Sequence, residues 1–105
     1  MTRATLINVF QVPPERDEEF LGLWERANEL LQVAAGYEST RLHRALQPDA
    51  KYRFINVAEI GSVEDWRAVI TSPEFVELSR RMAEFQPAPS LYTVAREHDL
   101  RSTAR

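Results

Sequence analysis

Two asparagines interrupt otherwise apolar strand faces and are the first candidates for chemistry. Strand alternation over 52–60 places Asn56 on one face with Tyr52, Phe54, Ala58 and Ile60. Over 5–12 it places Asn8 with Leu6, Phe10 and Val12. An amide buried on such a face costs roughly 1–3 kcal/mol unless it finds a hydrogen-bond partner. Either the fold or a bound ligand must therefore supply that partner.

A histidine and a tryptophan add two further candidates. His43 has an unperturbed pKa suited to a general base at neutral pH, although a strand histidine also commonly lies at the surface. It shares a predicted strand face with Tyr37, Ser39 and Arg41. Trp66 falls at helical spacing with Val69 and Ile70, where an aromatic side chain serves either as core or as a pocket wall.

The charged residues give weaker evidence for a functional site than the residues above. The carboxylates of Glu15, Asp17, Glu18 and Glu19 open a predicted helix, where the helix dipole favours negative charge, so we do not interpret them as a metal site. The arginines could anchor an anionic ligand, but arginine stems also pack along sheet edges with their heads in water.

Composition bounds the class of protein. The 105 residues are 44% hydrophobic and 28% charged, which is typical of a soluble globular chain. A net charge of −3 argues against a nucleic-acid partner, and the lack of cysteine excludes disulfides and thiolate chemistry. We find no signal peptide and no apolar stretch long enough to span a membrane, so a cytoplasmic protein is expected.

The elements that must position these residues follow from hydrophobic periodicity. The sequence predicts strands at 5–12, 37–47, 51–60 and 90–97. It predicts a helix at 14–35 with Gly36 as its C′ residue, and a second helix at 63–84. Ser62 is expected to cap the second helix, which restarts at Ser72 and Pro73. One domain at 1–97 and a polar tail at 98–105 are expected.

This order predicts an α+β fold: a ferredoxin-like β-α-β-β-α-β arrangement with a four-stranded antiparallel sheet. Helices cover one sheet face, and the chain has no third layer for the other, although the strands are apolar on both faces. We therefore expect a homodimer that associates through the second sheet face.

Two long segments carry a resemblance to a known family. LINVFQVPPERDEEFLGLW (6–24) and GYESTRLHRALQPDAKYRFINVAEIGSVEDW (36–66) resemble the antibiotic biosynthesis monooxygenase family, a branch of the dimeric α+β barrel superfamily. The resemblance spans about residues 5–97 and implies a dimeric α+β barrel. The family includes anthrone and quinol-forming oxygenases, haem-degrading enzymes and members of unknown reaction.

The resemblance implies a cofactor-independent monooxygenase that oxidises an aromatic or polyketide-type compound with dioxygen. Asn56 and Asn8 would orient and stabilise the ionised substrate, and His43 would move protons. Trp66, with Phe54 and Tyr52, would form the substrate-binding wall. No metal and no cofactor would be required.

Two departures keep other functions open. Ile60 stands where oxygenases of this family often have tryptophan, and 71–82 has no histidine to ligate haem, which argues against haem degradation. The alternatives are a non-catalytic small-molecule-binding or accessory dimer, and a cyclase or isomerase on the same scaffold.

Overall fold

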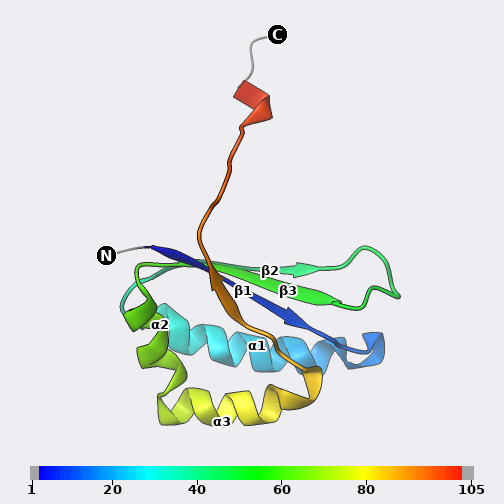
Figure 1. The fold of residues 1–105 in the computed structure, drawn as a ribbon. Coiled ribbons are helices and arrows are strands. Elements are labelled where there is room, and N and C mark those ends of the chain that lie inside the picture. The colour runs from blue at the N-terminus through cyan, green and yellow to red at the C-terminus, as the bar shows by residue number, and fades with distance from the viewer. Residues whose placement is uncertain (1–2, 103–105) are drawn as a thin grey trace.

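The structure is a computed structural model that describes residues 3–102. Its strands and α-helices follow the predicted order, with the second helix divided into two (Figure 1). The elements are β1 (Ala4–Phe10), α1 (Asp17–Gln32), β2 (Tyr37–Arg44), β3 (Phe54–Ile60), α2 (Val63–Ile70), α3 (Pro73–Met82) and β4 (Ser90–Tyr92). Short 3-10 helices lie at η1 (Pro14–Arg16), η2 (Ala83–Phe85) and η3 (Leu100–Ser102). The predicted ferredoxin-like fold is confirmed.

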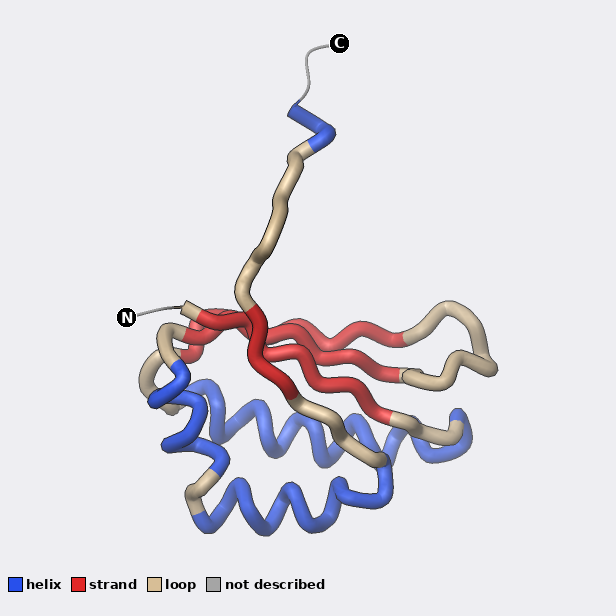
Figure 2. Tube along the Cα trace, viewed as in Figure 1, coloured by secondary structure: helices blue, strands red, loops and turns tan. Residues whose placement is uncertain are grey.

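The strands form one antiparallel sheet in the order β2-β3-β1-β4. All three α-helices lie against one face of this sheet, and the opposite face carries none in the part of the chain described (Figure 2). In the central register, Asn8 of β1 lies opposite Asn56 of β3, and Leu42 of β2 lies opposite Asn56 on its other side.

The core is densest at one end of the sheet, where four phenylalanines meet. The Phe20 ring of α1 lies 4.8 Å from that of Phe10, 4.7 Å from that of Phe54 and 5.5 Å from that of Phe85, measured between ring centroids. Phe20 and Phe85 are fully buried. This cluster anchors α1 and η2 to β1 and β3.

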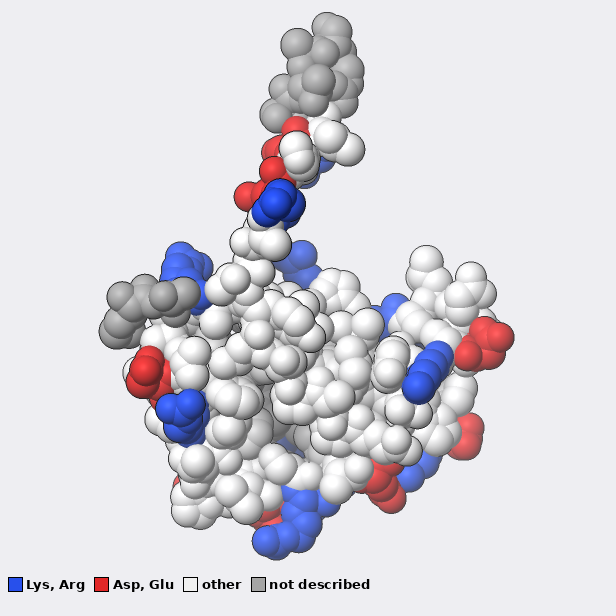
Figure 3. Space-filling model, viewed as in Figure 1, with Lys and Arg blue, Asp and Glu red and all other residues white. Residues whose placement is uncertain are grey.

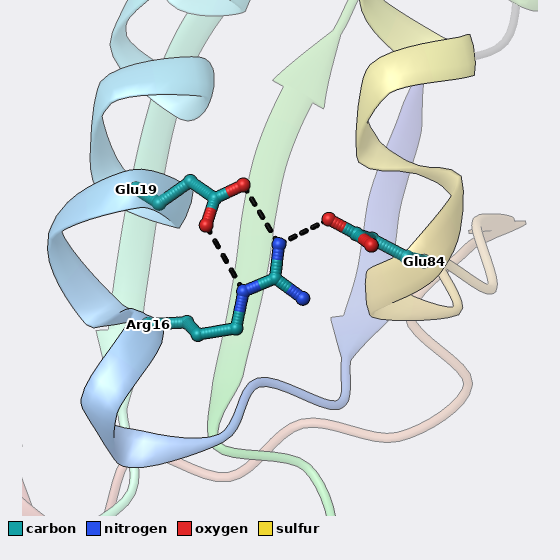
Figure 4. Close-up of polar contacts among 3 residues, drawn as sticks. All are labelled: Arg16, Glu19 and Glu84. Atoms are coloured by element: carbon teal, nitrogen blue, oxygen red, sulfur yellow. Dashed lines mark hydrogen bonds and ion pairs between the residues drawn. The ribbon is translucent and has the colours of Figure 1, made fainter.

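A polar cluster covers the outside of this aromatic core. The Arg16 guanidinium donates to Glu19 on α1 and to Glu84 on η2, as Figure 4 shows. It also lies 4.7 Å from the Phe85 ring centroid, within the range of a cation–π contact. The cluster therefore links the start of the first helix to the end of the last one.

The helix caps of the second half agree with the sequence. The Ser62 hydroxyl accepts a hydrogen bond from the Asp65 backbone N–H at 3.1 Å, and the Ser72 hydroxyl accepts one from the Phe75 N–H at 3.4 Å. Pro73 is the first residue of α3, where its missing N–H costs nothing. The break between α2 and α3 thus lies where the sequence predicts it.

Gly36 has a different role from the predicted one. The helix ends at Gln32, so Gly36 is not its C′ residue. Gly36 instead precedes β2 with φ +86°, and a Cβ on it would lie 2.0 Å from the Asp65 carboxylate. Its carbonyl accepts a hydrogen bond from the Gly61 N–H at 2.7 Å. It is a glycine because two loops meet there at close range.

Strand β4 is shorter than the predicted strand over 90–97. It pairs with β1 from Ser90–Ile7 to Tyr92–Thr5, and β1 begins one residue further on, at Ala4. The strand ends because its partner ends. Residues 93–101 are exposed and run away from the body of the protein (Figure 1). The predicted tail over 98–105 lies partly outside the described residues.

Candidate functional site

A cavity of about 340 Å³ lies between the sheet and the helices. None of the described residues that line it is Asp, Glu, Lys, Arg or His. The face drawn in Figure 3 likewise has its charged side chains mainly at the edges. The lining residues are Leu6, Asn8, Phe10, Trp24, Ala27, Asn28, Leu31, Tyr37, Asn56, Trp66, Ile70, Phe75, Ser79, Met82, Pro87 and Pro89.

The two predicted asparagines lie side by side in this cavity. Asn8 and Asn56 are register partners on adjacent antiparallel strands, so their side chains share one sheet face. Both line the cavity, and Asn56 is only 5% exposed. The structure therefore brings together the two polar exceptions that strand alternation identified.

The protein fixes the orientation of both amides through their oxygens. Asn8 Oδ1 accepts a hydrogen bond from the Ala88 backbone N–H at 2.9 Å. Asn56 Oδ1 accepts one from the Thr40 hydroxyl at 2.9 Å. Neither amide nitrogen has a hydrogen-bond partner among residues 3–102. The pair therefore offers N–H donors, which suit a carbonyl or an oxyanion on a ligand.

Aromatic side chains form much of the remaining wall. Trp66 of α2 lines the cavity. Trp24 of α1 and Phe75 of α3 also line it. The sequence marks Trp24 and Phe75 as apolar helix positions, but periodicity alone cannot separate a core position from a cavity wall. Together these rings suit a flat apolar ligand.

Three predicted site residues lie outside the cavity. His43 pairs with Ile55, so it lies on the sheet face away from the helices, and its Nδ1 is 3.3 Å from the Ile55 carbonyl oxygen. The expectation that it approaches the pocket is wrong, because Leu42 holds the register position opposite Asn56. Tyr52 precedes β3 and is 39% exposed. Phe54 is buried in the phenylalanine cluster.

Tyr37 reaches the cavity although alternation predicts it on the face of His43. A bulge between Tyr37 and Ser39 shifts the register by one residue, so Tyr37 lies opposite the buried Ile60. Burial, and next the nearby Asp65 carboxylate, raise the pKa of Tyr37 to about 12. At neutral pH it is an uncharged phenol that can donate a hydrogen bond but cannot act as an ionised base.

Asn28 of α1 is a third cavity amide, which the sequence reasoning missed. It lies on the helix wall with Trp24 and Leu31, four residues before it and three after it. Its Oδ1 is buried and has no hydrogen-bond partner among the described residues. The signal that could have found it is a polar residue in the same i, i+4, i+7 row as two large apolar residues.

Ile60, the departure from the family pattern, is fully buried and does not line the cavity.

Residues 3–102 contain no group of three or more His, Cys, Asp or Glu residues that could hold a metal ion. Within the same residues, no helix is both long and apolar enough to cross a membrane.

Comparisons with known proteins match this architecture. A sequence model of the antibiotic biosynthesis monooxygenase family matches residues 3–81. A candidate monooxygenase of known structure from Shewanella loihica PV-4 is 31% identical, over 91% of this chain and 97% of that one, with a TM-score of 0.74. No curated protein matches the sequence significantly.

Two more distant structures share the fold. SnoaB, a cofactor-independent oxygenase from Streptomyces nogalater, is 18% identical over 92% of this chain and 97% of its own, with a TM-score of 0.74. A dimeric protein of unknown function from Bacteroides fragilis NCTC 9343, with a ferredoxin-like fold, is 18% identical over 88% and 96%, with a TM-score of 0.69. At such identities the likeness is one of fold.

Proposed function

Because the chain belongs to the antibiotic biosynthesis monooxygenase family, we propose that it oxidises an aromatic or polyketide-type compound with dioxygen and without a bound cofactor. The observation that carries this proposal is the cross-strand pair of Asn8 and Asn56 in an apolar cavity. Each residue has its amide oxygen held by the protein, which leaves an N–H group for the substrate.

The reaction that suits this cavity begins with an ionised substrate hydroxyl. Its negative charge is stabilised by the N–H groups of Asn8 and Asn56, which are held in place before the reaction and lie in a site of low polarity. The electron-rich ring then reduces dioxygen. A ring CH₂ becomes C=O, with one oxygen atom of O₂ entering the product and the other leaving as water.

The aromatic residues would hold the substrate rings. Trp24 and Trp66 line the cavity from two different helices, and stacking or edge contacts with aromatic rings are worth about 0.5–1.5 kcal/mol each beyond burial. Tyr37 lies opposite Ile60 and lines the cavity. We infer that it supplies the aromatic surface that Ile60 does not.

The proposal assigns proton transfer to solvent or to the substrate itself. The position of His43 does not support the proton-transfer role expected from the sequence, because it lies on the other sheet face. Tyr37 holds its own proton at neutral pH. Substrates whose hydroxyl has a pKa near or below the pH of the assay should therefore react fastest.

Oxygen uptake with polycyclic anthrones and hydroquinones, in the absence of added cofactor, tests the proposal. Replacement of Asn56 by Ala should lower kcat on the order of a hundredfold, as for the loss of one oxyanion donor. His43→Ala is the matched control and should keep kcat within about threefold. A folded protein that consumes no oxygen across the panel would contradict the oxygenase function.

One observation favours a second candidate, a small-molecule-binding protein without catalysis. The cavity has no described lining residue that is ionised at neutral pH, and so no evident general base. Such a protein would bind hydroxylated aromatic compounds and leave them unchanged under oxygen. A cyclase or isomerase would instead release a product of unchanged oxidation level, which mass spectrometry distinguishes.

We also propose that the protein is a homodimer, joined through the sheet face away from the helices. This face carries half-buried apolar side chains from the two central strands, Ile7, Val9, Ile55 and Val57. The helices leave it uncovered within the described chain (Figure 2). The relative from Bacteroides fragilis is described as dimeric, which supports the proposal.

A further inference from the structure

Asn28 is expected to lower the stability of the ligand-free protein at its position in α1. Asparagine is a poor helix former in a helix interior, because its amide competes for backbone hydrogen bonds. Asn28 occupies the second half of α1. Its Oδ1 is sealed from solvent and unpartnered among residues 3–102, which adds the cost of an unmade hydrogen bond. Leucine would avoid both costs and would extend the apolar row of Trp24 and Leu31.

The surroundings of Asn28 offer no internal partner. The other α1 residues that line the cavity are Trp24, Ala27 and Leu31, and the α3 residues that line it are Phe75, Ser79 and Met82. Among these, only Trp24 and Ser79 have a polar side-chain atom, and no hydrogen bond joins either of them to Asn28 within the described chain. Asn28 therefore lines the cavity without an internal hydrogen-bond partner for its amide oxygen.

We propose that Asn28 determines ligand specificity by binding a second polar group of the ligand, at the α1 wall. The inference rests on the proposed function for the aromatic class of ligand. The sheet wall presents the N–H groups of Asn8 and Asn56, and the α1 wall presents the side-chain amide of Asn28, whose oxygen is enclosed and has no partner within the described chain. The ligand class is thus a polycycle with a hydroxyl or carbonyl at each of two separated edges.

Two ligands of matched size test whether the protein recognises the second polar group of the ligand. Both 2,6-dihydroxynaphthalene and 6-methyl-2-naphthol carry one hydroxyl for the sheet wall. They differ in having a hydroxyl or a methyl group at the other end. Moving a hydroxyl from water into an apolar wall is unfavourable unless the wall supplies a hydrogen-bond partner. Preference for the dihydroxy probe therefore reports such a partner.

The experiment is titration calorimetry under argon, so that binding is measured without oxidation. The wild-type protein should bind the dihydroxy probe five- to tenfold more tightly than the methyl probe, where tenfold corresponds to about 1.4 kcal/mol. Asn28→Leu should reduce this ratio to one or below. The matched control Gln32→Leu, which removes an exposed amide of the same helix from outside the cavity lining, should leave the ratio unchanged.

A second readout does not depend on any ligand. Because Asn28→Leu removes an unpaired amide from the free protein, its urea midpoint should move to higher concentration. A merely structural amide would move the midpoint lower. Asn28→Ala, which adds space but also lacks the amide, should lose the preference for the dihydroxy probe if Asn28→Leu proves poorly folded.

A wild-type ratio of one or below, a ratio that survives in Asn28→Leu, or no binding of either probe would each overturn the inference. The proposed oxygenase function is decided separately by oxygen uptake. If the protein consumes no oxygen but shows the predicted ratio, only the reaction is wrong. If oxygen is consumed and the ratio is absent, only the role of Asn28 is wrong.

Discussion

The polar side chains that the described part of the chain brings to the cavity are all uncharged. The amides of Asn8, Asn28 and Asn56, the hydroxyl of Ser79, the indole N–H groups and the phenol of Tyr37 remain neutral over the physiological pH range. A charge that develops on a bound substrate would thus meet fixed dipoles in place of a counter-ion. Such dipoles act strongly only because water is largely excluded.

The raised pKa of Tyr37 makes a prediction about alkaline stability. An unfolded tyrosine loses its proton near pH 10, whereas folded Tyr37 keeps it to about pH 12. Between these values the unfolded state binds fewer protons, so the free energy of unfolding falls as pH rises. The loss should approach about 2 kcal/mol near pH 12. Urea unfolding at pH 9, 10 and 11 measures it by circular dichroism.

Tyr37→Phe provides the control for this effect. It should remove part of the alkaline loss while leaving the other tyrosines, Tyr52 and Tyr92, in place. Equal pH dependence in the wild type and the variant would show that Tyr37 ionises normally.

At the scale of single residues, the sequence identified polar exceptions on strands better than those on helices. Asn8 and Asn56 stood out because strict alternation defines which neighbours share their face. Asn28 did not stand out, since an amphipathic helix has polar residues beside its apolar stripe as a rule. Tyr37 was assigned to the wrong face, because a single bulge reverses the alternation and has no reliable sequence signal.

At the scale of elements, a four-residue junction holds β2, β3 and α2 together at one end of the cavity. The Ser62 hydroxyl donates to Asp65 Oδ2 at 3.0 Å while accepting from the Asp65 N–H. Gly36 and Gly61 form a backbone hydrogen bond beside this carboxylate. The junction places Tyr37 and Trp66, which follow its residues directly in the chain.

Two glycine substitutions test the junction against a matched position. Gly36→Ala should cost at least about 2 kcal/mol, because its φ of +86° disfavours a side chain and its Cβ would meet Asp65. Gly22→Ala lies inside α1 with nothing within 4 Å and should stabilise by about 0.5–1 kcal/mol. Urea unfolding measures both. A loss below 1 kcal/mol for Gly36→Ala would mean that the junction relaxes easily.

A half-buried ion pair joins the start of α1 to the residue before β3. Arg53 donates from Nε to Asp17 Oδ1 and from a terminal nitrogen to Oδ2, each at 2.8 Å. This bidentate pairing holds the pKa of Asp17 below its ordinary value. The pair therefore contributes stability above about pH 4 that is lost as the pH falls through the lowered pKa.

Asp17→Asn should lower the urea midpoint at pH 7, because it leaves Arg53 without its counter-charge. The difference from the wild type should shrink as the pH is lowered from 5 toward 2, since both proteins then lack the carboxylate. Acid titration followed by circular dichroism measures this convergence. Parallel curves over that range would show that the pair does not contribute.

Element order was predictable and element ends were not. The break between α2 and α3 followed from Ser72 and Pro73, whose cap geometry is local. The ends of α1 and β4 depend on distant residues. Helix α1 is followed by a turn in which Gly36 lies against Asp65. Strand β4 ends where its partner strand β1 begins. Sequence periodicity carries no information about such contacts.

At the scale of the whole molecule, the sheet has one face packed by helices and one face without them (Figure 2). The proposed dimer would bury the second face. Its apolar centre combines Ile7 and Val9 with Ile55 and Val57, and its edge on β2 carries the exposed Arg41 and His43. An apolar centre with a polar rim is the usual anatomy of a protein interface.

Val57→Arg should convert the proposed dimer to a monomer, because it places a charge in the centre of the buried face. Light scattering coupled to size-exclusion chromatography measures the mass. Val33→Arg is the matched control, since Val33 is 85% exposed at the end of α1, and it should leave the mass unchanged. A monomeric wild type, or a folded Val57→Arg variant of dimeric mass, would contradict the proposal.

The general architecture could be predicted because it depends on many residues at once. Alternation in four segments and helical spacing in two determine the layers even when several ends are misplaced. The cavity could be predicted only in part, since an empty space depends on small differences in how helices pack. The family match then confirmed the fold but left the substrate to experiment.

The chain has two tryptophans, and both Trp24 and Trp66 line the cavity. All of its intrinsic indole emission therefore originates from the walls of one space. A ligand that enters should change the intensity or wavelength of that emission, with no label and no knowledge of the reaction. Intrinsic tryptophan fluorescence of the unmodified protein can therefore be used to screen compound collections for ligands of the cavity.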